Sequence, residues 1–270
     1  MGSSVVVIGN FDGVHPGHRE VLAEARRRRP HLPLVVVTFW PHPVSVLRPD
    51  APPMLLTSLE GRIELLTAAG ADRVEVIPFT REFAAWSPAE FVERVIVPLD
   101  PALVVVGENF RFGHLASGNV DTLRELSRGR FDVDGLPLVR FGDEETCSTR
   151  IRDALAAGDV AHAAEHLGRR FRFRGVVAHG DRRGRQLGFP TANLPVPEYR
   201  ASAGTARTPT AGPCRRARSR SGGRRRSRSA RTPRSTVPIA GWSPMSSTGT
   251  TWSCTVPRSS SSSSPGFAAR

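Results

Sequence analysis

The sequence contains no lysine, so all 38 of its basic residues are arginines. It also has no aspartate or glutamate after Glu198, whereas 14 of the arginines lie between Arg200 and Arg270. Residues 1–198 carry 24 arginines against 25 acidic residues and are close to neutral. The formal charge of +13 therefore belongs to the C-terminal segment alone, and the rest of the chain lacks the basic excess that binds nucleic acid.

Cysteines and long apolar runs are scarce as well. The three cysteines, Cys147, Cys214 and Cys254, are odd in number and lack the spacing of metal ligands. This usage excludes a disulfide framework and fits a reducing compartment. The sequence shows no signal peptide and no apolar segment long enough to span a bilayer. We therefore expect a cytoplasmic protein.

A compact motif near the N-terminus is the most informative part of the chain. Val5–Ile8, an apolar run of strand length, leads through a turn with two glycines into His15–His18. Pro16 favours a helix start, because proline has no backbone N–H and the first N–H of a helix would have no partner within the helix. His15 and His18 then lie near the same helix N-terminus, where free N–H groups and the helix dipole attract anions. An isolated pair would be two surface histidines, but the glycine turn before it predicts a phosphate site.

Up to about residue 140, apolar runs of strand length alternate with helical patterns. Ser58 is expected to cap one helix, and Ser87 with Pro88 and Glu90 gives a capping-box start for another. The alternation predicts an α/β fold, a Rossmann-like parallel sheet with helices on both faces. Such sheets bind ligands beyond the carboxyl ends of their strands, where residues 9–18 would lie. The expected strands are Val5–Ile8, Leu34–Phe39, Arg73–Ile77, Leu103–Val106 and Leu136–Val139.

Two loops that follow expected strands carry aromatic residues. Thr38–Pro43 is extended, because a residue before proline avoids the helical region. Its rigid aromatic wall suits a flat ring, and we favour that interpretation over a plain connecting loop. Asn109 lies in a glycine-bracketed loop after another strand, where its amide could hydrogen-bond the edge of a ring. The neighbouring Phe110 and Phe112 could instead simply plug the core.

A third polar segment, Cys147–Arg152, precedes a helix expected over Asp153–Ala157. Its two hydroxyl groups could merely cap that helix. However, Arg150 and Arg152 stand beside these hydroxyls at a helix start, which makes a suitable clamp for pyrophosphate.

These segments, in this order, resemble the nucleotidylyltransferase superfamily. Gly-Asn-Phe-Asp-Gly-Val-His-Pro-Gly-His resembles its flavin branch, the bacterial bifunctional riboflavin kinase/FMN adenylyltransferase (FAD synthetase) family. The resemblance covers about residues 4–195 and departs at Cys147, where the family usually has serine. It implies an adenylyltransferase domain over residues 1–168, which transfers AMP from ATP to FMN in FAD biosynthesis, with Mg²⁺ bridging the phosphates.

The resemblance also implies roles for individual residues. His15, His18 and Arg152 are expected to be catalytic, acting on the phosphates and the departing pyrophosphate. The expected nucleotide contacts are Gly9, Asn10, Phe11, Asp12, Gly13, Gly17, Ser148, Thr149 and Arg150, and the expected flavin contacts are Phe39, Pro41, His42, Pro43 and Asn109.

Gly-Phe-Pro-Thr-Ala-Asn at residues 188–193 resembles the signature of the riboflavin kinase module. In that family, the signature implies that Thr191 and Asn193 hold Mg²⁺-ATP at a small β-barrel. The pattern ends near Pro197, so we assign residues 169–198 to the truncated start of such a module. Residues 199–270 are assigned to a disordered Arg/Ser-rich tail, because they contain too little apolar surface to bury.

The tail is best explained as a kinase module read in the wrong frame. Joining the last base of each codon to the first two of the next, Arg228–Val237 permits Val-Gly-Thr-Asn-Pro-Thr-Phe-Asp-Gly, which resembles a riboflavin kinase phrase. Trp242, Met245 and Trp252, whose single codons end in G, fit the same shifted reading. The catalytic glutamate of the kinase family is then absent, so we expect riboflavin kinase activity to be impaired.

Two other functions remain open. The chain could be a related transferase of the same fold, such as a cytidylyl- or pantetheine-type enzyme, although the kinase-like signature argues against it. Nucleic-acid binding would rest on the Arg/Ser tail alone, and the near neutrality of residues 1–198 argues against it. The expected partners are therefore ATP, FMN and riboflavin, without a membrane, and a homo-oligomer is left open.

Overall fold

The computed structural model describes residues 2–137, 140–141, 144–145, 147–176, 178, 195–202, 242–245 and 251–255. The chain divides into two compact units. The first comprises Met1–Asp153, His166–Gly168 and Tyr199–Ala201, and the second comprises Ala154–Glu165, Arg169–Glu198 and Ser202–Arg270. The two expected kinase-module residues, Thr191 and Asn193, lie outside the described residues.

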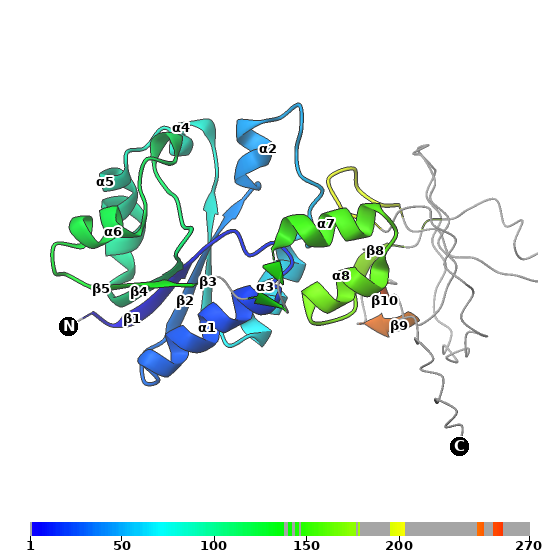
Figure 1. The fold of residues 1–270 in the computed structure, drawn as a ribbon, viewed down its shortest axis with the longest axis horizontal. Helices are drawn as coiled ribbons and strands as arrows, with labels where there is room; N and C mark the ends of the chain where they lie inside the picture. The colour runs from blue at the N-terminus through cyan, green and yellow to red at the C-terminus, as the bar shows by residue number, and fades with distance from the viewer. Residues whose placement is uncertain are drawn as a thin grey trace, which may run out of the picture. The chain divides into compact units, whose positions relative to one another are not determined.

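The first unit is built on a five-stranded sheet with the order β3-β2-β1-β4-β5, in which all neighbours are parallel (Figure 1). The chain moves outward from β1 through β2 and β3, then returns to the other side of β1 for β4. This reversal opens a crevice at the carboxyl ends of β1 and β4, and it confirms the predicted parallel α/β sheet. The strands are β1 Ser4–Ile8, β2 Leu34–Trp40, β3 Arg73–Pro78, β4 Pro101–Gly107 and β5 Asp132–Leu136.

Four of the five expected strands are confirmed, but the fifth was misplaced. It was expected over Leu136–Val139, whereas β5 covers Asp132–Leu136. This strand lies at the sheet edge, and its polar residues reach the surface, where Asp132 pairs with Arg29 and Asp134 with Arg28. An edge strand needs no continuous apolar run, so the apolar pattern of the sequence gives no signal for this strand.

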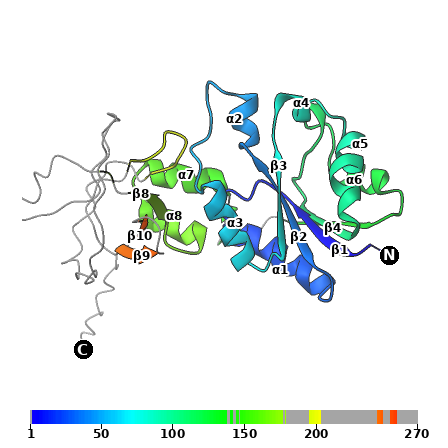
Figure 2. The same cartoon turned by 180° about the vertical axis from the view of Figure 1, so that it is seen from behind.

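Helices cover both faces of this sheet, as Figures 1 and 2 show. Alternate β1 residues point to opposite faces: Val5 and Val7 pack with α1 and α3, whereas Val6 and Ile8 pack with α5, α6 and the turns after α5. The helices are α1 Pro16–Arg28, α2 Pro43–Leu47, α3 Leu59–Ala68, α4 Arg81–Ala84, α5 Pro88–Phe91, α6 Val120–Ser127, α7 Ser148–Ala156 and α8 Val160–Leu167, with a π-helical turn Val92–Ile96 and 3₁₀ turns Val97–Leu99 and His114–Ala116.

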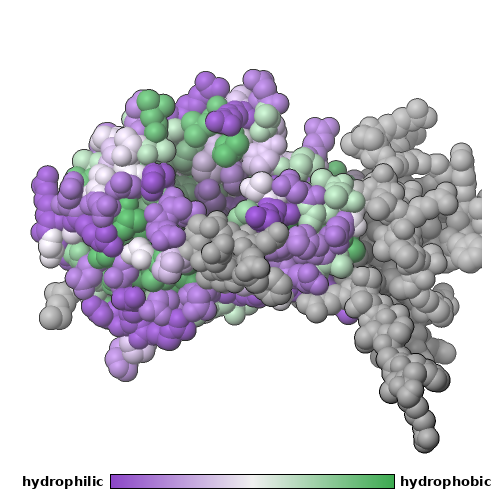
Figure 3. All heavy atoms as spheres, in the orientation of Figure 1, coloured by the Kyte–Doolittle hydropathy of each residue, from purple (hydrophilic) through white to green (hydrophobic). Residues whose placement is uncertain are grey.

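Capping hydrogen bonds confirm the two predicted helix starts. Ser58 accepts a hydrogen bond from the Gly61 amide, and Ser87 forms the reciprocal capping box with Glu90. The outer face of α1 carries Glu–Arg ion pairs and is hydrophilic, in agreement with the purple lower part of the unit in Figure 3. No helix in the described ranges combines the length and the apolar character needed to cross a membrane.

The start of α7 corrects the sequence analysis. The helix was expected over Asp153–Ala157, but it begins at Ser148. Ile151 and Leu155 are both fully buried and lie four residues apart, which is helical spacing that starts before the expected first helical residue, Asp153. The polar residues that were expected to precede the helix therefore form its first turns.

The second unit contains an antiparallel sheet with the order β8-β10-β9. Its strands are β8 Arg172–Val176, β9 Trp242–Met245 and β10 Thr251–Thr255, so β9 and β10 fall within the range assigned to the tail. Tyr199–Ala201, also within that range, belong to the first unit, and Arg200 and Ala201 are buried there, so these residues are not part of a disordered tail. The other predictions for residues 203–270 concern residues that are mostly outside the described ranges, and the boundaries at 168 and 198 stay predictions. A short antiparallel pair, β6 Arg140–Phe141 and β7 Glu144–Glu145, follows β5.

Candidate active site

A cavity of about 1270 Å³ lies in the first unit, at the carboxyl ends of β1, β2 and β4. One part of its wall is polar and comes from the loop after β1 and the N-terminal turns of α1 and α7. Another part is aromatic. The cavity wall includes fourteen residues named from the sequence: Gly9, Asn10, Phe11, Asp12, His15, Gly17, His18, Phe39, His42, Pro43, Asn109, Ser148, Thr149 and Arg152.

Three expected contacts do not line this cavity: Gly13, Pro41 and Arg150. Gly13 is buried with φ +86°, and a Cβ there would lie 2.8 Å from Leu56 Cδ1, so its role is to allow close packing. Arg150 is an exposed residue of α7. It directly follows Thr149, which lines the cavity, but it does not line the cavity itself. Pro41 is exposed at the end of β2. These three residues neighbour cavity-lining residues in the sequence, but they lie outside the cavity wall.

His15 and His18 lie together at the start of α1, as expected. Their rings are stacked with centroids 3.6 Å apart and an interplanar angle of 22°, and Phe11 packs edge-on against His18 at 5.1 Å. The His15 side chain does not cap the helix. A Cβ on Gly9 would lie 2.9 Å from the Phe11 ring, so a larger residue there would displace this ring. The two imidazoles and the N-terminal end of α1 therefore act on one place in the cavity.

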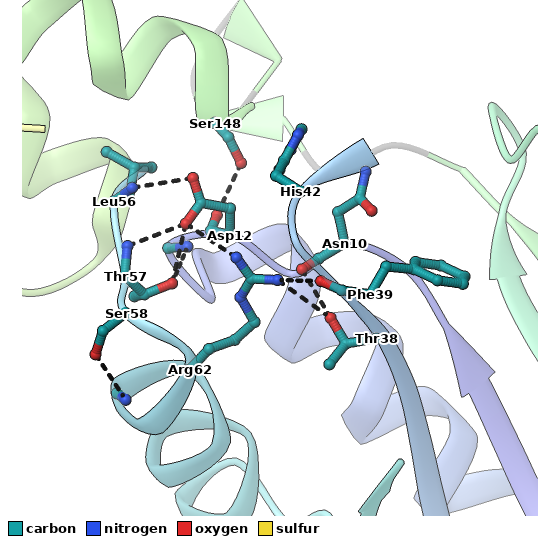
Figure 4. A network of polar contacts seen from close by, with 12 residues as sticks. Asn10, Asp12, Thr38, Phe39, His42, Leu56, Thr57, Ser58, Arg62 and Ser148 are labelled. Carbon is teal, nitrogen blue, oxygen red and sulfur yellow. Dashed lines mark hydrogen bonds and ion pairs between the residues drawn. The ribbon is translucent and has the colours of Figure 1, made fainter. Parts of the chain in front are cut away.

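Asp12 is the centre of a buried polar network, and its side chain is 1% exposed (Figure 4). One carboxylate oxygen accepts from the Leu56 amide at 3.0 Å and from Arg152 Nη2 at 2.8 Å. The other accepts from the Thr57 amide at 3.0 Å and its hydroxyl at 2.9 Å, with Arg62 Nη2 at 3.6 Å. The carboxylate is thus fully occupied by protein groups.

Burial by itself raises the pKa of Asp12, but the Arg62 charge, the Leu56 amide and Arg152 together outweigh it. The pKa of this carboxyl therefore lies below its ordinary value, and the group is charged. The expected contact of Asp12 with the nucleotide stays a prediction for its backbone, whereas its carboxylate binds Arg152.

Arg62 on α3 is a member of this network that the sequence analysis missed. Its side chain is fully buried, and Nη1 donates to the Phe39 carbonyl at 3.2 Å and to Thr38 Oγ1 at 3.4 Å. Thr38 Oγ1 in turn donates to the Asn10 carbonyl at 3.0 Å, as Figure 4 shows. The available signal was its position four residues before the buried Leu66, on the apolar side of the helix.

Arg152 joins the two halves of the polar wall, although it lies 140 residues from Asp12 in the sequence. Its Nε donates to the Met54 carbonyl at 2.9 Å, and its side chain is 17% exposed. Ser148 Oγ donates to the Asp12 carbonyl at 2.8 Å, which fixes the first turn of α7 on the loop after β1. The guanidinium is thus held from one side while it lines the cavity on the other.

The aromatic wall is made by residues from the β2, β3 and β4 ends and the α4–α5 region. Phe39 contacts the rings of Phe79 and Phe83 at 6.0 and 5.9 Å, and Phe83 contacts Trp86 at 4.9 Å. Phe112 belongs to the core, the role considered for it from the sequence, and it also lines the cavity. This part of the cavity offers an apolar surface suited to a planar ring, with the exposed Asn109 beside it.

His42 caps α2, with its Nδ1 accepting from the Val44 amide at 3.2 Å. It is 7% exposed, and desolvation lowers its pKa to about 4; the Asp12 charge opposes this, whereas Arg152 and Arg62 add to it. His42 is therefore neutral in the folded protein above that pH.

The pKa of His42 predicts a pH dependence of stability. Because the folded pKa of about 4 is below the ordinary 6.5, its contribution is fully present above pH 6.5 and is lost as the pH falls towards 4. We expect the free energy of unfolding to fall by about 1–3 kcal/mol over this window. His42→Asn, which keeps a capping oxygen, should abolish this fall in the free energy of unfolding. His31→Asn, at an exposed position, should not change it. Urea unfolding at pH 4.5, 5.5 and 7 measures it; identical pH profiles for His42→Asn and the parent would contradict it.

Comparison with known families gives two matches. A family model described as FAD synthetase matches residues 1–150, and one described as riboflavin kinase matches residues 167–208. The chain is 37% identical over 194 residues to a bifunctional riboflavin kinase/FMN adenylyltransferase of Bacillus subtilis, covering 71% of this chain and 61% of that protein. It is 37% identical over 196 residues to the protein of the same name from Escherichia coli, covering 71% and 63%.

Among solved structures, the chain is similar to one described as a macrolide-efflux protein from Streptococcus pneumoniae. The TM-score is 0.69 at 32% identity, and the match covers 75% of this chain and 67% of that one. The chain thus spans less than two thirds of the length of the curated relatives it matches.

Proposed function

The chain belongs to the FAD synthetase family, and on that premise we propose that it transfers the adenylyl group of ATP to FMN, giving FAD and pyrophosphate. One observation carries the proposal. The two imidazoles at the start of α1 and Arg152 of α7 line a single cavity that also has an aromatic wall. Such a cavity has cationic and hydrogen-bonding groups for a triphosphate and an apolar surface for a flavin ring.

In the proposed reaction, an oxygen of the FMN phosphate attacks the α-phosphorus of ATP in line. A new P–O bond forms there, the bond to the β-phosphate breaks, and pyrophosphate leaves with its electron pair. Both substrates are anionic, so the protein has to position them and stabilise charge. His15 and His18 donate hydrogen bonds to the phosphates, supported by the dipole of α1.

The departing pyrophosphate is assigned to Arg152. Its Nε and Nη2 already bind the protein, so the guanidinium is fixed in orientation before ATP arrives. Thr149, exposed in the first turn of α7, adds a hydroxyl, and Ser148 lines the same wall. Asp12 is placed behind Arg152 as a positioning residue.

The flavin is assigned to the aromatic wall. Phe39 of β2 and His42 and Pro43 at the start of α2 form one side of it, and Asn109 after β4 supplies an amide for the ring edge. Since Pro41 lies outside the wall, we leave it out of the flavin site.

Mg²⁺ was expected to bridge the phosphates. Across the described part of the chain, no group of three or more His, Cys, Asp or Glu residues is arranged to hold a metal ion. The Asp12 oxygens are taken by amides, a hydroxyl and two guanidinium groups. The Asp12 carboxylate is therefore not open to Mg²⁺, the bridging of the phosphates by Mg²⁺ stays a prediction, and we derive no step through it.

Purified protein incubated with FMN and ATP tests the proposal. We expect stoichiometric formation of FAD and pyrophosphate, no adenylylation of phosphopantetheine by ATP, and no cytidylylation of an alcohol phosphate when CTP is supplied instead of ATP. Turnover of one of these other acceptors without FAD formation would replace FMN by that acceptor. Riboflavin as a second substrate, a homo-oligomer and a cytoplasmic location stay predictions.

Riboflavin kinase activity is a separate prediction. Thr191 and Asn193 match the kinase signature, but the sequence that follows carries no acidic residue after Glu198 and so cannot supply a catalytic carboxylate there. We expect no measurable FMN from riboflavin and ATP, even when the same preparation converts FMN to FAD. FMN formation by a protein whose intact mass matches the printed sequence would contradict this expectation.

A further inference from the structure

Tyr199–Ala201 belong to the first compact unit and pair with Leu55 in a short parallel bridge. The Leu55 amide donates to the Tyr199 carbonyl at 2.7 Å, and the Ala201 amide donates to the Leu55 carbonyl at 2.8 Å. Leu55 is 3% exposed and Ala201 is 4% exposed. Both backbone groups of Leu55 are therefore satisfied, inside the protein, by a segment far away in the sequence.

The side chains of this segment strengthen the bridge. Arg200 is 6% exposed, and its Nη2 donates to the Leu56 carbonyl at 3.3 Å. The Tyr199 ring meets Trp40 edge-on, with centroids 6.2 Å apart. Burial lowers the pKa of Arg200, while the Asp12 charge acts in the opposite direction. Arg200 is thus close enough to the polar network to interact with its central carboxylate.

Leu55 lies in the middle of the segment that holds the proposed pyrophosphate clamp. On one side of it, the Met54 carbonyl accepts from Arg152 Nε at 2.9 Å. On the other side, the amides of Leu56 and Thr57 each donate to Asp12 at 3.0 Å. Residues 54–57 therefore set the position of Arg152 directly and through Asp12.

We propose that Tyr199–Ala201 are a positioning segment for the adenylyl-transfer site: they fix residues 54–57 and thereby the orientation of Arg152 towards the triphosphate. This inference rests on the proposed function. Residues 199–201 fall within the range matched by the riboflavin kinase model and outside the range matched by the FAD synthetase model. Adenylyl transfer in this chain then depends on residues outside the range that the FAD synthetase model matches.

The test removes one backbone hydrogen bond. Ala201→Pro in the full chain deletes the N–H that binds Leu55, whereas Ser202→Pro, at the exposed next residue, is the matched control. We expect the Kd for ATP, measured by calorimetry, to rise about tenfold in Ala201→Pro, because Arg152 loses its fixed orientation. The Kd for FMN should stay within about twofold, because the flavin wall contains none of these residues. The control should match the parent for both ligands.

Unequal effects on the two ligands are what separates positioning from general destabilisation. If Ala201→Pro weakens both ligands equally, or neither, the inference is overturned. Should Ala201→Pro not fold, Arg200→Met, compared with the exposed Arg48→Met, takes its place with the same expected split. If the parent binds ATP but makes no FAD, the proposed function fails, while the ratio of ATP Kd values between the variants still decides this inference. A parent that does not bind ATP overturns both.

Discussion

His18→Ala is expected to lower the kcat of FAD formation by about 10²–10³-fold, with KM values for ATP and FMN changed less than about threefold. His18 lines the cavity at the N-terminal end of α1, stacked on His15. There, its hydrogen bond meets charge that develops at the α-phosphate, so the interaction is stronger in the transition state than in the ground state. A loss confined to kcat is the signature of such a contact.

Steady-state kinetics of FAD formation check this expectation, with His31→Ala as the control. His31 is exposed and lies outside the cavity wall, so its removal should leave both constants unchanged. The stacked pair adds a second requirement: His15→Ala,His18→Ala should cost less than the product of the two single effects, because both rings serve one site. Wild-type turnover by His18→Ala would remove His18 from the chemistry.

Asp12→Asn is expected to lower the free energy of unfolding by about 3–5 kcal/mol. The substitution leaves the shape nearly unchanged but removes the negative charge between Arg62 and Arg152, whose side chains are 0% and 17% exposed. Two guanidinium groups are then left without their compensating charge, and the amide can no longer accept from every donor that the carboxylate binds. FAD formation should fall as well, because Arg152 loses its support.

Urea unfolding of Asp12→Asn measures the effect, with Asp72→Asn as the matched control. Asp72 also binds an arginine and a backbone amide, Arg26 and Leu34, but its side chain is 51% exposed, so its loss should cost no more than about 1 kcal/mol. Equal losses for the two variants would refute the central place given to Asp12.

The Asp12 carboxylate should also determine how the stability of the protein falls at acidic pH. Its folded pKa is below the ordinary 3.8, so its contribution is fully present above that pH and is lost as the pH falls through the folded value. The parent should therefore lose stability steeply below about pH 4, and Asp12→Asn should show a shallower acid limb. This limb lies below the His42 window, which begins at pH 6.5, so the two effects are separable.

The sequence by itself determined the parts of this protein that depend on local patterns. Apolar runs located β1 to β4, serine caps located α3 and α5, and the motif at His15–His18 located the start of α1. Parallel strands that alternate with helices bring their carboxyl ends to one edge. The cavity and most of its polar wall were therefore predictable before any contact was known.

Only the tertiary structure decided which groups meet across long distances in the chain. Nothing local marked Arg62 on α3 as a buried partner of Asp12, and the four donors that occupy the Asp12 carboxylate come from residues far away in the sequence. The role of Tyr199–Ala201 beside Leu55 had no local signal at all. The physical reason is that local patterns report periodicity and capping, whereas the partner of a buried charge or amide is set by packing.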